Sequence, residues 1–520
     1  MVETLGEVLP LAARRYGGKT ALVSDGRSFT FNELEVSSNA FANGLVAAGI
    51  RPGDTVTLYG PNSWQWLVAY YGVAKAGAVV NPVNVMLTPE EVKFIIGDCG
   101  ARAVVASADK AAALMDMKGN TSLSEVVIWG DKPPAGTTPF DRWLEQGKPN
   151  FTPARRSPND TGAICYTSGT TGHPKGAVQS IRSIVATAKG TALMHSRTSA
   201  DTVVSPLPAP HVYGSCVLNA GVLVGATLVM LPRFSEEGVL DAIQTHRATM
   251  FDCVPTAYYY LLAHPKLASY DLASLTRCTV GGQTLPVAKS QEWSERTGVP
   301  VLELWGMTEL AGAATFNPYW GDNKPGTIGL PMPGMSCKIV DVENADKEMP
   351  QGERGELMIK GPLVMDGYAG DEKSTKATIR PDGWMHTGDI ATADEDGYYT
   401  IVDRKKDMIL TAGYNVYPAE LERVLCMHAA VALAAVCGVA DEAKGELAKA
   451  YVMLKPGASA SGKELVEHCR RHLAAYKLPR AVQFVASVPI TGSGKIMRRL
   501  LKDVDDGTRT ASEQRQMRDG

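Results

Sequence analysis

Residues 166–176 read Tyr-Thr-Ser-Gly-Thr-Thr-Gly-His-Pro-Lys-Gly. The stretch combines four Ser or Thr hydroxyls and three glycines with a single lysine, Lys175, and it directly follows the apolar residues 162–166. Glycines let backbone N–H groups approach phosphate oxygens, hydroxyls add donors, and a lysine supplies a compact positive charge. The sequence therefore predicts a strand followed by a loop that wraps a polyphosphate, rather than a flexible Ser/Gly linker. The spacing does not fit the Gly-x-x-x-x-Gly-Lys-Ser/Thr frame of the common nucleotide-binding loop.

The bulk composition is that of an ordinary globular protein. A chain of 520 residues is too long for one compact core, so two or more domains are expected. Hydrophobic residues make up 45% and charged residues 21% of the chain, as is usual for soluble proteins. The net charge of −3 provides no basic surface, so we expect no nucleic-acid partner. No run of about twenty apolar residues predicts a membrane span.

Nine cysteines are scattered along the chain, at positions 99, 165, 216, 253, 278, 337, 426, 437 and 469. None forms a Cys-x-x-Cys pair and most lie in apolar runs, which indicates free thiols rather than zinc ligands or disulfides. The first residues lack the basic and apolar regions of a signal peptide, and the last ones carry no Ser-Lys-Leu signal. We therefore expect a cytoplasmic protein.

The first half of the chain alternates strand and helix patterns. Strands are predicted at 54–59, 78–83 and 102–106, and a helix at 64–76 that Gly77 would end. A second helix is predicted to start at Thr88-Pro89-Glu90-Glu91, with an N-cap, a proline in the first turn and a glutamate three residues after the cap. This alternation predicts an α/β fold, with parallel sheets covered by helices.

The second half of the chain has a different pattern. Residues 301–413 are rich in Gly, Pro and short alternating strands, which predicts a β-rich subdomain closing the large domain. After Arg404 a mixed α and β pattern returns for about the length of one small domain, including a predicted helix at 465–477. A charged cluster at 403–407 separates the two patterns. We therefore expect an N-terminal domain at 1–404 and a C-terminal domain at 405–520.

Four further stretches carry candidate chemistry. They read Leu-Trp-Gly-Met-Thr-Glu at 304–309, Trp-Met-His-Thr-Gly-Asp at 384–389, Thr-Ala-Gly-Tyr-Asn-Val at 411–416 and Pro-Ile-Thr-Gly-Ser-Gly-Lys-Ile at 489–496. Together with residues 166–176 they resemble, in order and spacing, the motifs of the acyl-adenylate-forming enzymes. That superfamily includes acyl-CoA synthetases, adenylation domains of peptide synthetases and luciferases. The resemblance covers nearly the whole chain, and it implies a large N-terminal domain followed by a small mobile α+β C-terminal domain.

The resemblance implies a binding site for ATP and Mg²⁺. Glu309 would bind magnesium, with Thr167 beside it, and Asp389 would accept hydrogen bonds from the ribose hydroxyls. Trp305 stands where the family has a tyrosine that packs on adenine, so the contact of the tyrosine hydroxyl is expected to be lost. The full expected ATP site comprises Thr167, Ser168, Gly169, Thr170, Thr171, Gly172, Lys175, Gly282, Gln283, Leu304, Trp305, Gly306, Met307, Thr308, Asp389, Arg404 and Lys495.

The resemblance also implies two half-reactions, in which the acid is adenylated and the acyl group is then passed to CoA. Lys495 would contact the carboxylate and the α-phosphate during adenylation. Rotation about Lys406 would then bring the CoA-facing residues Gly413 and Tyr414 to the site. The expected catalytic residues are Lys175, His211, Glu309 and Lys495, with His211 acting as a gate beside the carboxylate; a core histidine is the equal alternative.

The acyl pocket is expected at His211, Tyr213, Gly214, Val280, Gly281, Gly306, Leu310 and Ala313. Amino-acid-activating relatives carry an aspartate near the position of His211, whereas no Asp or Glu lies between Val203 and Phe234 here. Acetate-specific relatives carry a tryptophan at the position of Gly306, so the pocket should be deeper than acetate needs. No clear counterpart is seen for the pocket arginine of malonate-specific relatives. Apolar residues surround this region, at Val212, Val217, Leu218, Val222, Tyr258, Tyr259, Met307 and Leu310.

These expectations describe an AMP-forming carboxylic acid–CoA ligase whose substrates are ATP, CoA and a small carboxylic acid. A medium- or long-chain fatty acid is the expected acid, and an aryl acid of the coumarate or ferulate type is the alternative. An acyl-AMP ligase that loads a carrier protein is a further alternative. The chain carries no legible oligomer interface, and a homodimer is left open.

Overall fold

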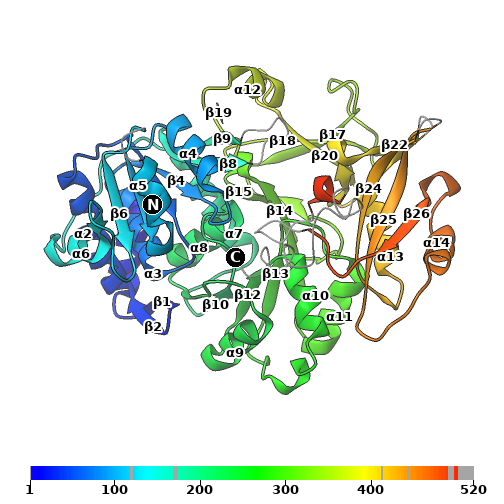
Figure 1. The fold of residues 1–520 in the computed structure, drawn as a ribbon, viewed down its shortest axis with the longest axis horizontal. Helices are drawn as coiled ribbons and strands as arrows, with labels where there is room; N and C mark the ends of the chain where they lie inside the picture. The colour runs from blue at the N-terminus through cyan, green and yellow to red at the C-terminus, as the bar shows by residue number, and fades with distance from the viewer. Residues whose placement is uncertain are drawn as a thin grey trace.

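The computed structural model describes residues 2–117, 121–167, 174–411, 414–441, 444–489 and 497–501. Two large sheets with helices around them form most of the molecule, and a smaller unit built from the C-terminal residues packs at one end (Figure 1). The fold is the predicted α/β class. The predicted loop residues 168–173, 412–413 and 490–496 lie outside the described part of the chain.

The first large sheet confirms the predicted alternation of strands and helices. Its inner strands pair in parallel, and only the pairs β8–β9 and β9–β19 are antiparallel. The parallel strands β3, β4, β5 and β7 are each followed by a helix, and the buried strands β3, β4 and β5 are apolar along most of their length. In spatial order the described strands are β19 (Gly367–Tyr368), β9 (Lys175–Ser180), β8 (Thr161–Thr167), β4 (Val79–Val83), β3 (Thr55–Tyr59), β5 (Ala103–Ser107), β6 (Glu125–Trp129) and β7 (Thr138–Pro139).

The helices that accompany this sheet begin and end largely where the sequence predicts. The α4 helix starts with the predicted capping box, in which Thr88 and Glu91 satisfy each other's backbone N–H groups. The chain turns at Gly77, with φ +74°, directly after α3 and its C-cap. The helices are α2 (Phe31–Ala47), α3 (Trp64–Lys75), α4 (Pro89–Asp98), α5 (Ala111–Met117) and α6 (Phe140–Gln146).

The second large sheet is also parallel through its centre, from β1 through β11, β10, β12 and β13 to β14. The antiparallel strands β2, β15 and β16 extend its two edges. The described strands, in spatial order, are β16 (Leu330–Pro331), β15 (Gly312–Phe316), β14 (Val301–Met307), β13 (Arg277–Val280), β12 (Met250–Cys253), β10 (Thr202–Ser205), β11 (Thr227–Met230), β1 (Thr20–Ser24) and β2 (Arg27–Thr30).

Helices α1 (Val8–Tyr16), α7 (Ile181–Met194) and α8 (Val212–Val224) pack in the core that joins the two large sheets. The outer face of the second sheet is covered by α9 (Glu236–His246), α10 (Pro255–Ala263) and α11 (Val287–Thr297). Because α8 packs against α7 and against β11 and β15 of the second sheet, the start of α8 is fixed close to the carboxyl ends of that sheet's parallel strands.

The stretch 301–413 is rich in strands, as predicted, but it does not form one subdomain. Strands β14, β15 and β16 complete the second large sheet, β19 joins the edge of the first, and β22 belongs to the C-terminal unit. The remainder forms an antiparallel sheet of four described strands, β17 (Ser336–Val340), β18 (Gly355–Lys360), β20 (Met385–Ala393) and β21 (Tyr399–Arg404), beside the short helix α12 (Glu372–Thr378). Local strand patterns do not reveal which sheet a strand joins, because the pairing partners lie far away in the sequence.

The C-terminal unit follows the short 3₁₀ helix η5 (Lys405–Asp407). Its described elements are β22 (Ile409–Thr411), β23 (Tyr414–Val416), α13 (Pro418–Cys426), β24 (Val431–Asp441), β25 (Gly445–Leu454), α14 (Gly462–Arg470) and β26 (Ala481–Phe484). The helix expected at 465–477 is wrong in its bounds. A capping box at Ser461 starts α14 earlier, and the later apolar residues belong to turns and the separate 3₁₀ helix η6 (Ala475–Lys477).

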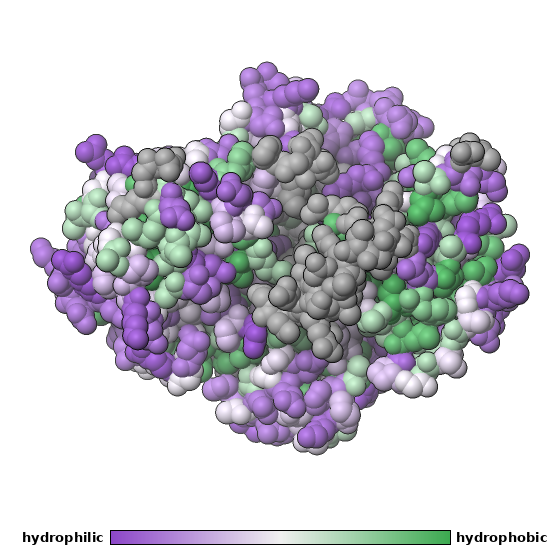
Figure 2. Space-filling view, viewed as in Figure 1, coloured by the Kyte–Doolittle hydropathy of each residue, from purple (hydrophilic) through white to green (hydrophobic). Residues whose placement is uncertain are grey.

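All nine cysteines lie in described segments and all are free thiols, as predicted. None of the helices in the described residues is long and apolar enough to cross a membrane. On the face seen in Figure 2, hydrophilic residues cover most of the rim, whereas apolar residues gather over the C-terminal sheet.

Candidate active site

A cleft of about 1280 Å³ runs between the large part of the chain and the C-terminal unit. Its walls bring together residues that are up to about four hundred positions apart, from Glu91 to Arg498, and many of them belong to the stretches singled out in the sequence. The site residues predicted from the sequence that line the cleft are Gly282, Gln283, Leu304, Trp305, Gly306, Asp389, Arg404 and Lys406.

One wall of the cleft is formed where the parallel strands β13 and β14 end. The chain leaves β13 through Gly281 and Gly282, and the positive φ of Gly282, +90°, is a backbone conformation that favours glycine. A Cβ atom on Gly281 would lie 2.5 Å from Leu304 Cδ1, so only glycine lets these two strand ends pack this closely. Ligand sites in α/β sheets lie at this end of parallel strands.

Asp389 is held between an indole and a guanidinium group. Trp305 Nε1 donates a hydrogen bond to Asp389 Oδ2 at 2.8 Å, and Arg404 Nε lies 3.2 Å from Oδ1. The backbone N–H of Asp389 donates to Thr387 Oγ1 at 3.1 Å. Both Trp305 and Asp389 are buried, although each lines the cleft. The indole N–H thus gives Trp305 a polar contact of its own with the carboxylate, and the expected loss of the tyrosine hydroxyl contact stays a prediction.

Glu309 lies in the short 3₁₀ helix η4 (Thr308–Leu310), directly after β14. Its Oε1 accepts a hydrogen bond from the hydroxyl of Tyr368 at 2.8 Å, and its backbone carbonyl accepts from Met365 N at 2.8 Å. Desolvation and the neighbouring Glu309 raise the pKa of Tyr368, so its hydroxyl stays protonated and donates. The neighbouring Thr308 is fixed through its carbonyl, which accepts from Gln179 Nε2 at 2.8 Å.

The surroundings of Glu309 fit magnesium. Mg²⁺ is usually held by one or two carboxylates, with the remaining positions taken by waters and substrate phosphates. Glu309 provides one such carboxylate, with Oε1 oriented by Tyr368. No group of three or more His, Cys, Asp or Glu side chains that could hold a metal by itself occurs among the described residues. The donor set thus suits an ion that arrives with a nucleotide.

Lys175, at the start of β9, does not contact Glu309 in this conformation. Its Nζ lies 3.6 Å from Asp371 Oδ2, donates to the hydroxyl of Ser374, and lies 5.4 Å from the centre of the Tyr368 ring. The hydrogen bonds from Ser374, and secondarily the charge of Lys175, lower the pKa of Asp371. The lysine is thus held by the first turn of α12, at the side of the site.

Of the predicted acyl-pocket residues, all of which are described, Gly306 alone is among those that line the cleft. His211 is the N-cap of α8, and its Nδ1 accepts from Tyr213 N at 3.2 Å. The hydroxyl of Tyr213 bonds to Thr279 Oγ1 at 2.8 Å inside the core. A Cβ on Gly214 would lie 2.1 Å from the carbonyl oxygen of Pro208, so this glycine serves a close backbone approach. Val280, Gly281, Leu310 and Ala313 are buried.

Gly306 does not leave open space. A Cβ at this position would lie 1.8 Å from the carbonyl oxygen of Gly312 on the paired strand β15. Any side chain at this position would require the β14–β15 backbone to shift, and the expectation of a pocket deeper than acetate needs stays a prediction. The sequence could not show this steric restriction, because the close approach arises from pairing between the two strands.

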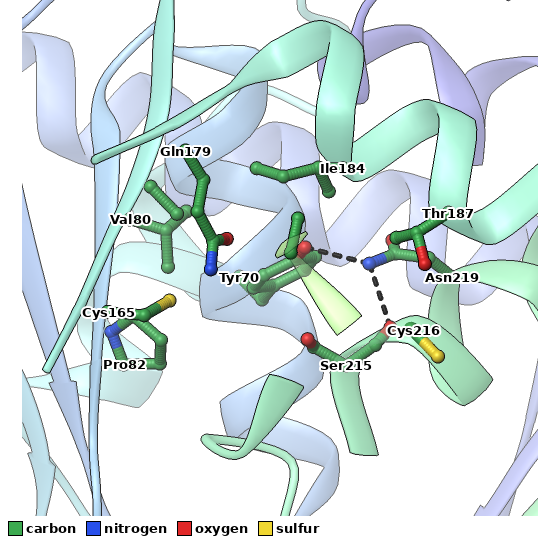
Figure 3. Close-up of a pocket in the computed structure, with 12 residues that line it drawn as sticks. Tyr70, Val80, Pro82, Cys165, Gln179, Ile184, Thr187, Ser215, Cys216 and Asn219 are labelled. Carbon is green, nitrogen blue, oxygen red and sulfur yellow. Dashed lines mark hydrogen bonds between the residues drawn. The ribbon is translucent and has the colours of Figure 1, made fainter. Parts of the chain in front are cut away.

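Figure 3 shows a separate, narrow cavity beneath α8, between that helix and the first large sheet. Asn219 Nδ2 donates to the hydroxyl of Tyr70 at 2.8 Å and to the carbonyl of Ser215 at 2.9 Å. The cavity has a volume of about 10 Å³, which is enough for about one water molecule. The lining includes Val80, Pro82, Ala163, Cys165, Gln179, Ile184, Thr187, Cys216 and Ala311.

Charged side chains gather where the large part meets the C-terminal unit. Asp403 Oδ2 accepts from the backbone N–H of Ala419 at 2.8 Å, and burial raises the pKa of Asp403 to about 6. Arg498 pairs with Asp407 at 3.1 Å and with Glu422 at 2.7 Å. Lys406 lines the cleft beside them.

The chain matches two family models. Residues 9–369 match the model described as AMP-binding enzyme, and residues 420–495 match the C-terminal domain of AMP-binding enzymes. The chain belongs to the AMP-binding enzyme family.

Known members of this family match nearly the whole chain. A protein of Bacillus subtilis named long-chain-fatty-acid–CoA ligase is 35% identical, and the match covers 96% of this chain and 94% of that protein. A Rhodococcus jostii ligase, named for a dioxo-octahydroindenyl propanoyl substrate and CoA, is also 35% identical, over 96% of this chain and 98% of that protein.

Solved structures agree with these sequence matches. The anthranilate CoA ligase AuaEII in complex with anthranoyl-AMP superimposes with a TM-score of 0.91 at 30% identity, covering 97% of both chains. ATP-bound MatB from Rhodopseudomonas palustris gives a TM-score of 0.90 at 32% identity, covering 97% of this chain and 99% of that one.

The family and these relatives confirm the predicted enzyme class, an AMP-forming acid–CoA ligase of the acyl-adenylate-forming superfamily. ATP and CoA are the co-substrates of this AMP-binding enzyme class, and magnesium is its usual metal. The α/β fold with a large N-terminal and a smaller C-terminal part is confirmed as well.

Several predicted residues cannot be placed. Ser168, Gly169, Thr170, Thr171 and Gly172 of the phosphate loop lie outside the described residues, as do Gly413 and Lys495. Thr167 is described and pairs with Lys175 between β8 and β9. Tyr414 is described too, but it is more than half exposed and stacks on Tyr476 with ring centres 4.7 Å apart. It is not among the residues that line the cleft.

Three residues beside the site were missed by the sequence reading. Tyr368, Asp371 and Ser374 surround Lys175, and Tyr368 also holds Glu309. The pair Asp371 and Ser374 carries the local signal of a helix N-cap. That signal predicts the start of a helix but not its neighbour, so it could not have identified the contact with Lys175.

Proposed function

We propose that this AMP-binding enzyme is an acyl-CoA synthetase that acts on medium- or long-chain fatty acids. An oxygen of the fatty carboxylate attacks the α-phosphorus of ATP, the α–β phosphoanhydride bond breaks, and pyrophosphate leaves. The sulfur of CoA then attacks the acyl carbon, the acyl–phosphate bond breaks, and AMP leaves, while the thiol proton passes to solvent. The observation that carries the proposal is the cleft in which Trp305, Asp389 and Arg404 are held together beside the Gly281–Gly282 turn.

Each part of the nucleotide has a candidate partner in this geometry. Trp305 offers an aromatic surface to adenine, and Asp389 can accept hydrogen bonds from ribose hydroxyls. Thr308, Glu309 and Lys175 would serve the phosphate end, where Glu309 would hold magnesium. The metal would supply charge neutralisation at the phosphates. Positioning and charge stabilisation by these fixed groups are the main contributions a protein can make to such a displacement.

Two observations favour a fatty acid as the substrate. Relatives named long-chain-fatty-acid–CoA ligase match nearly the full chain at 34–35% identity. The segment between Val203 and Phe234 contains no carboxylate that could pair with a substrate ammonium, and α8 within it is predominantly apolar. Each methylene buried by the protein contributes roughly 0.8 kcal/mol, so an apolar pocket favours longer chains.

An aryl acid is the second candidate substrate. The anthranilate CoA ligase and a benzoate CoA ligase from Burkholderia xenovorans superimpose on this chain with TM-scores of 0.91 and 0.87. The Rhodococcus relative named for a bicyclic propanoyl substrate points to a ring-bearing acid as well. A carrier protein in place of CoA is the remaining alternative.

We also propose that the C-terminal unit turns about Lys406 between the two half-reactions, with the domain boundary after Arg404. Lys406 lies in the short η5 helix. Before it, Asp403 contacts Ala419 of the C-terminal unit, and after it Asp407 pairs with Arg498. Tyr414 lies on the exposed surface of the C-terminal unit, and such a rotation would carry it and Gly413 towards the acyl-adenylate. Lys495 is proposed to act on the adenylation step, and His211 to gate the carboxylate end of the pocket.

The proposal is tested by measuring pyrophosphate and AMP release with ATP, Mg²⁺ and acids from acetate to palmitate, together with cinnamates, with and without CoA. We expect turnover that depends on CoA and peaks on medium or long fatty acids. A peak on cinnamates would show that the substrate is an aryl acid and not a fatty acid. Acid-dependent pyrophosphate release without transfer of the acyl group to free CoA would indicate a carrier-protein partner instead.

A second experiment separates the half-reactions. Lys495→Ala should abolish formation of the acyl-adenylate but leave acyl transfer from supplied acyl-AMP to CoA. Equal loss of both steps would contradict the rotation model. The nine free cysteines further support a reducing, cytoplasmic location, and native mass measurement would decide whether the protein forms a homodimer.

A further inference from the structure

Trp305 and Asp389 come from different parts of the fold. Trp305 lies in β14 of the second large sheet, and Asp389 lies in β20 of the four-stranded sheet, 84 residues later. The hydrogen bond of 2.8 Å from the indole N–H to Asp389 Oδ2 therefore links two sheets across the wall of the cleft. A tryptophan N–H is a donor without any acceptor capacity, so its partner must be an acceptor at all times.

This hydrogen bond lies in a buried environment and not on the open surface. Asp389 is 4% exposed and Trp305 9% exposed, yet both line the cleft. A buried carboxylate with few partners rotates or is neutralised, whereas fixed donors keep it charged and oriented. Here the indole holds Oδ2, and Arg404 stands beside Oδ1 at 3.2 Å. The two groups approach different oxygens, so together they restrict the rotation of the carboxylate.

We infer that Trp305 is a positioning residue for Asp389, and that its N–H sets the orientation in which this carboxylate binds the hydroxyls of the ribose. This inference rests on the proposed function, because Asp389 must be the ribose ligand. It goes beyond that function in giving Trp305 a second task besides contact with adenine. The indole would join recognition of the base to recognition of the sugar through one side chain.

The test uses equilibrium binding of ATP and of 2′,3′-dideoxy-ATP, measured by calorimetry with the full-length protein in the absence of acid. The wild type should bind ATP more tightly than the dideoxy nucleotide. Trp305→Phe removes the N–H and keeps an aromatic ring, so any loss of ring contact with adenine weakens both nucleotides alike. Beyond this shared loss, we expect the affinity for ATP to fall about tenfold, as for the loss of one hydrogen bond to a charged group. The affinity for dideoxy-ATP should change by less than about twofold beyond the shared loss.

A double-mutant cycle measures whether Trp305 and Asp389 act together. Asp389→Ala should remove the discrimination between the two nucleotides, and Trp305→Phe should then have no further effect on that discrimination. The matched control is Trp320→Phe, because Trp320 Nε1 also donates to a side-chain oxygen, Ser196 Oγ at 2.8 Å, on the exposed surface. This control should leave both affinities unchanged, and a thermal melt of each variant checks that the fold is retained.

The outcomes separate the inference from the proposed function. Reduced discrimination in Asp389→Ala with full discrimination in Trp305→Phe would overturn the inference and leave the ribose role of Asp389 intact. Unreduced discrimination in Asp389→Ala would overturn the ribose assignment and the inference with it. Because binding is measured without turnover, failure of the enzyme to activate any acid would contradict the proposed function alone.

Discussion

Two carboxylates at the proposed nucleotide site, Glu309 and Asp389, are held in different ways. Asp389 contacts an indole N–H and a guanidinium, and both partners belong to stretches that the sequence reading had singled out. Glu309 takes one hydrogen bond from the phenol of Tyr368, a residue that no motif indicated. The first arrangement fixes the orientation of the carboxylate. The second leaves a carboxylate with fewer protein partners, which suits a ligand for a metal ion that arrives with the substrate.

The largest expected effect comes from the carboxylate with fewer partners. Glu309→Gln removes the charge that would hold magnesium but keeps the size of the side chain. We expect kcat for acid-dependent pyrophosphate release to fall by a factor of about 10² to 10³, the range for loss of one electrostatic stabiliser of the transition state. Steady-state kinetics at saturating ATP measure this. Unchanged kcat with normal dependence on Mg²⁺ concentration would remove Glu309 from the site.

Asp389→Ala should act on binding rather than on the chemical step. Its ribose contacts would be made equally in the ground state and in the transition state, so KM for ATP should rise while kcat changes little. Loss of hydrogen bonds to a charged group, at about 1.5–3 kcal/mol each, predicts a rise of KM by roughly 10- to 100-fold. A fall in kcat at constant KM would show that the two carboxylates do not divide these tasks.

A smaller effect is expected at Tyr368, which orients Glu309. Tyr368→Phe removes the hydroxyl that donates to Glu309 Oε1 and should lower kcat about tenfold, in line with one hydrogen bond to a charged acceptor. Tyr399→Phe is a matched control, because its hydroxyl also donates a hydrogen bond, to the carbonyl of Cys337 at 2.9 Å, in the four-stranded sheet. Equal kinetic effects of the two substitutions would show that Tyr368 has only a structural role.

The smallest effect concerns Asp403, a third carboxylate on the same β20–β21 hairpin as Asp389. Its carboxylate accepts hydrogen bonds from the backbone amides of Ala419 and Arg404, and burial raises its pKa from 3.8 to about 6. A carboxyl group whose folded pKa is raised stabilises the fold fully below its unfolded pKa and loses that contribution as the pH rises through its folded pKa. The wild type should therefore lose stability relative to Asp403→Asn between pH 4 and pH 7.

The size of that loss is bounded by the pKa shift. A shift of about two units corresponds to at most about 3 kcal/mol, so the difference in Tm between the two proteins should change by a few degrees. Thermal melts across this pH range measure it. A difference in Tm that stays constant with pH would show that Asp403 does not titrate with a raised pKa.

Much of this molecule could be predicted from local sequence signals. The capping box at Thr88 and Glu91 marked the start of α4, and Gly77 marked the end of α3, because both signals act within a few residues. The carboxylates Glu309 and Asp389 could be singled out because their motifs are short and continuous. Local order is set by nearby residues, and for these elements that information was sufficient.

The remainder depended on contacts between distant segments. The partners of Lys175 lie almost two hundred residues further along the chain, in the first turn of α12. The steric restriction at Gly306 arises only when β14 pairs with β15. The tie from Trp305 to Asp389 joins two sheets. Sequence patterns report periodicity and local propensity, and none of them states which strand ends meet.

The measurement that tests the account most directly is a crystal structure of the protein with a non-hydrolysable acyl-adenylate analogue, an alkyl acyl-sulfamoyl adenosine. We predict adenine against Trp305, both ribose hydroxyls within hydrogen-bond distance of Asp389, and the sulfamate directed towards Thr308. An adenosine bound in the cleft with its ribose away from Asp389, or an analogue bound outside the cleft, would contradict the division of tasks between Asp389 and Glu309 on which the account rests.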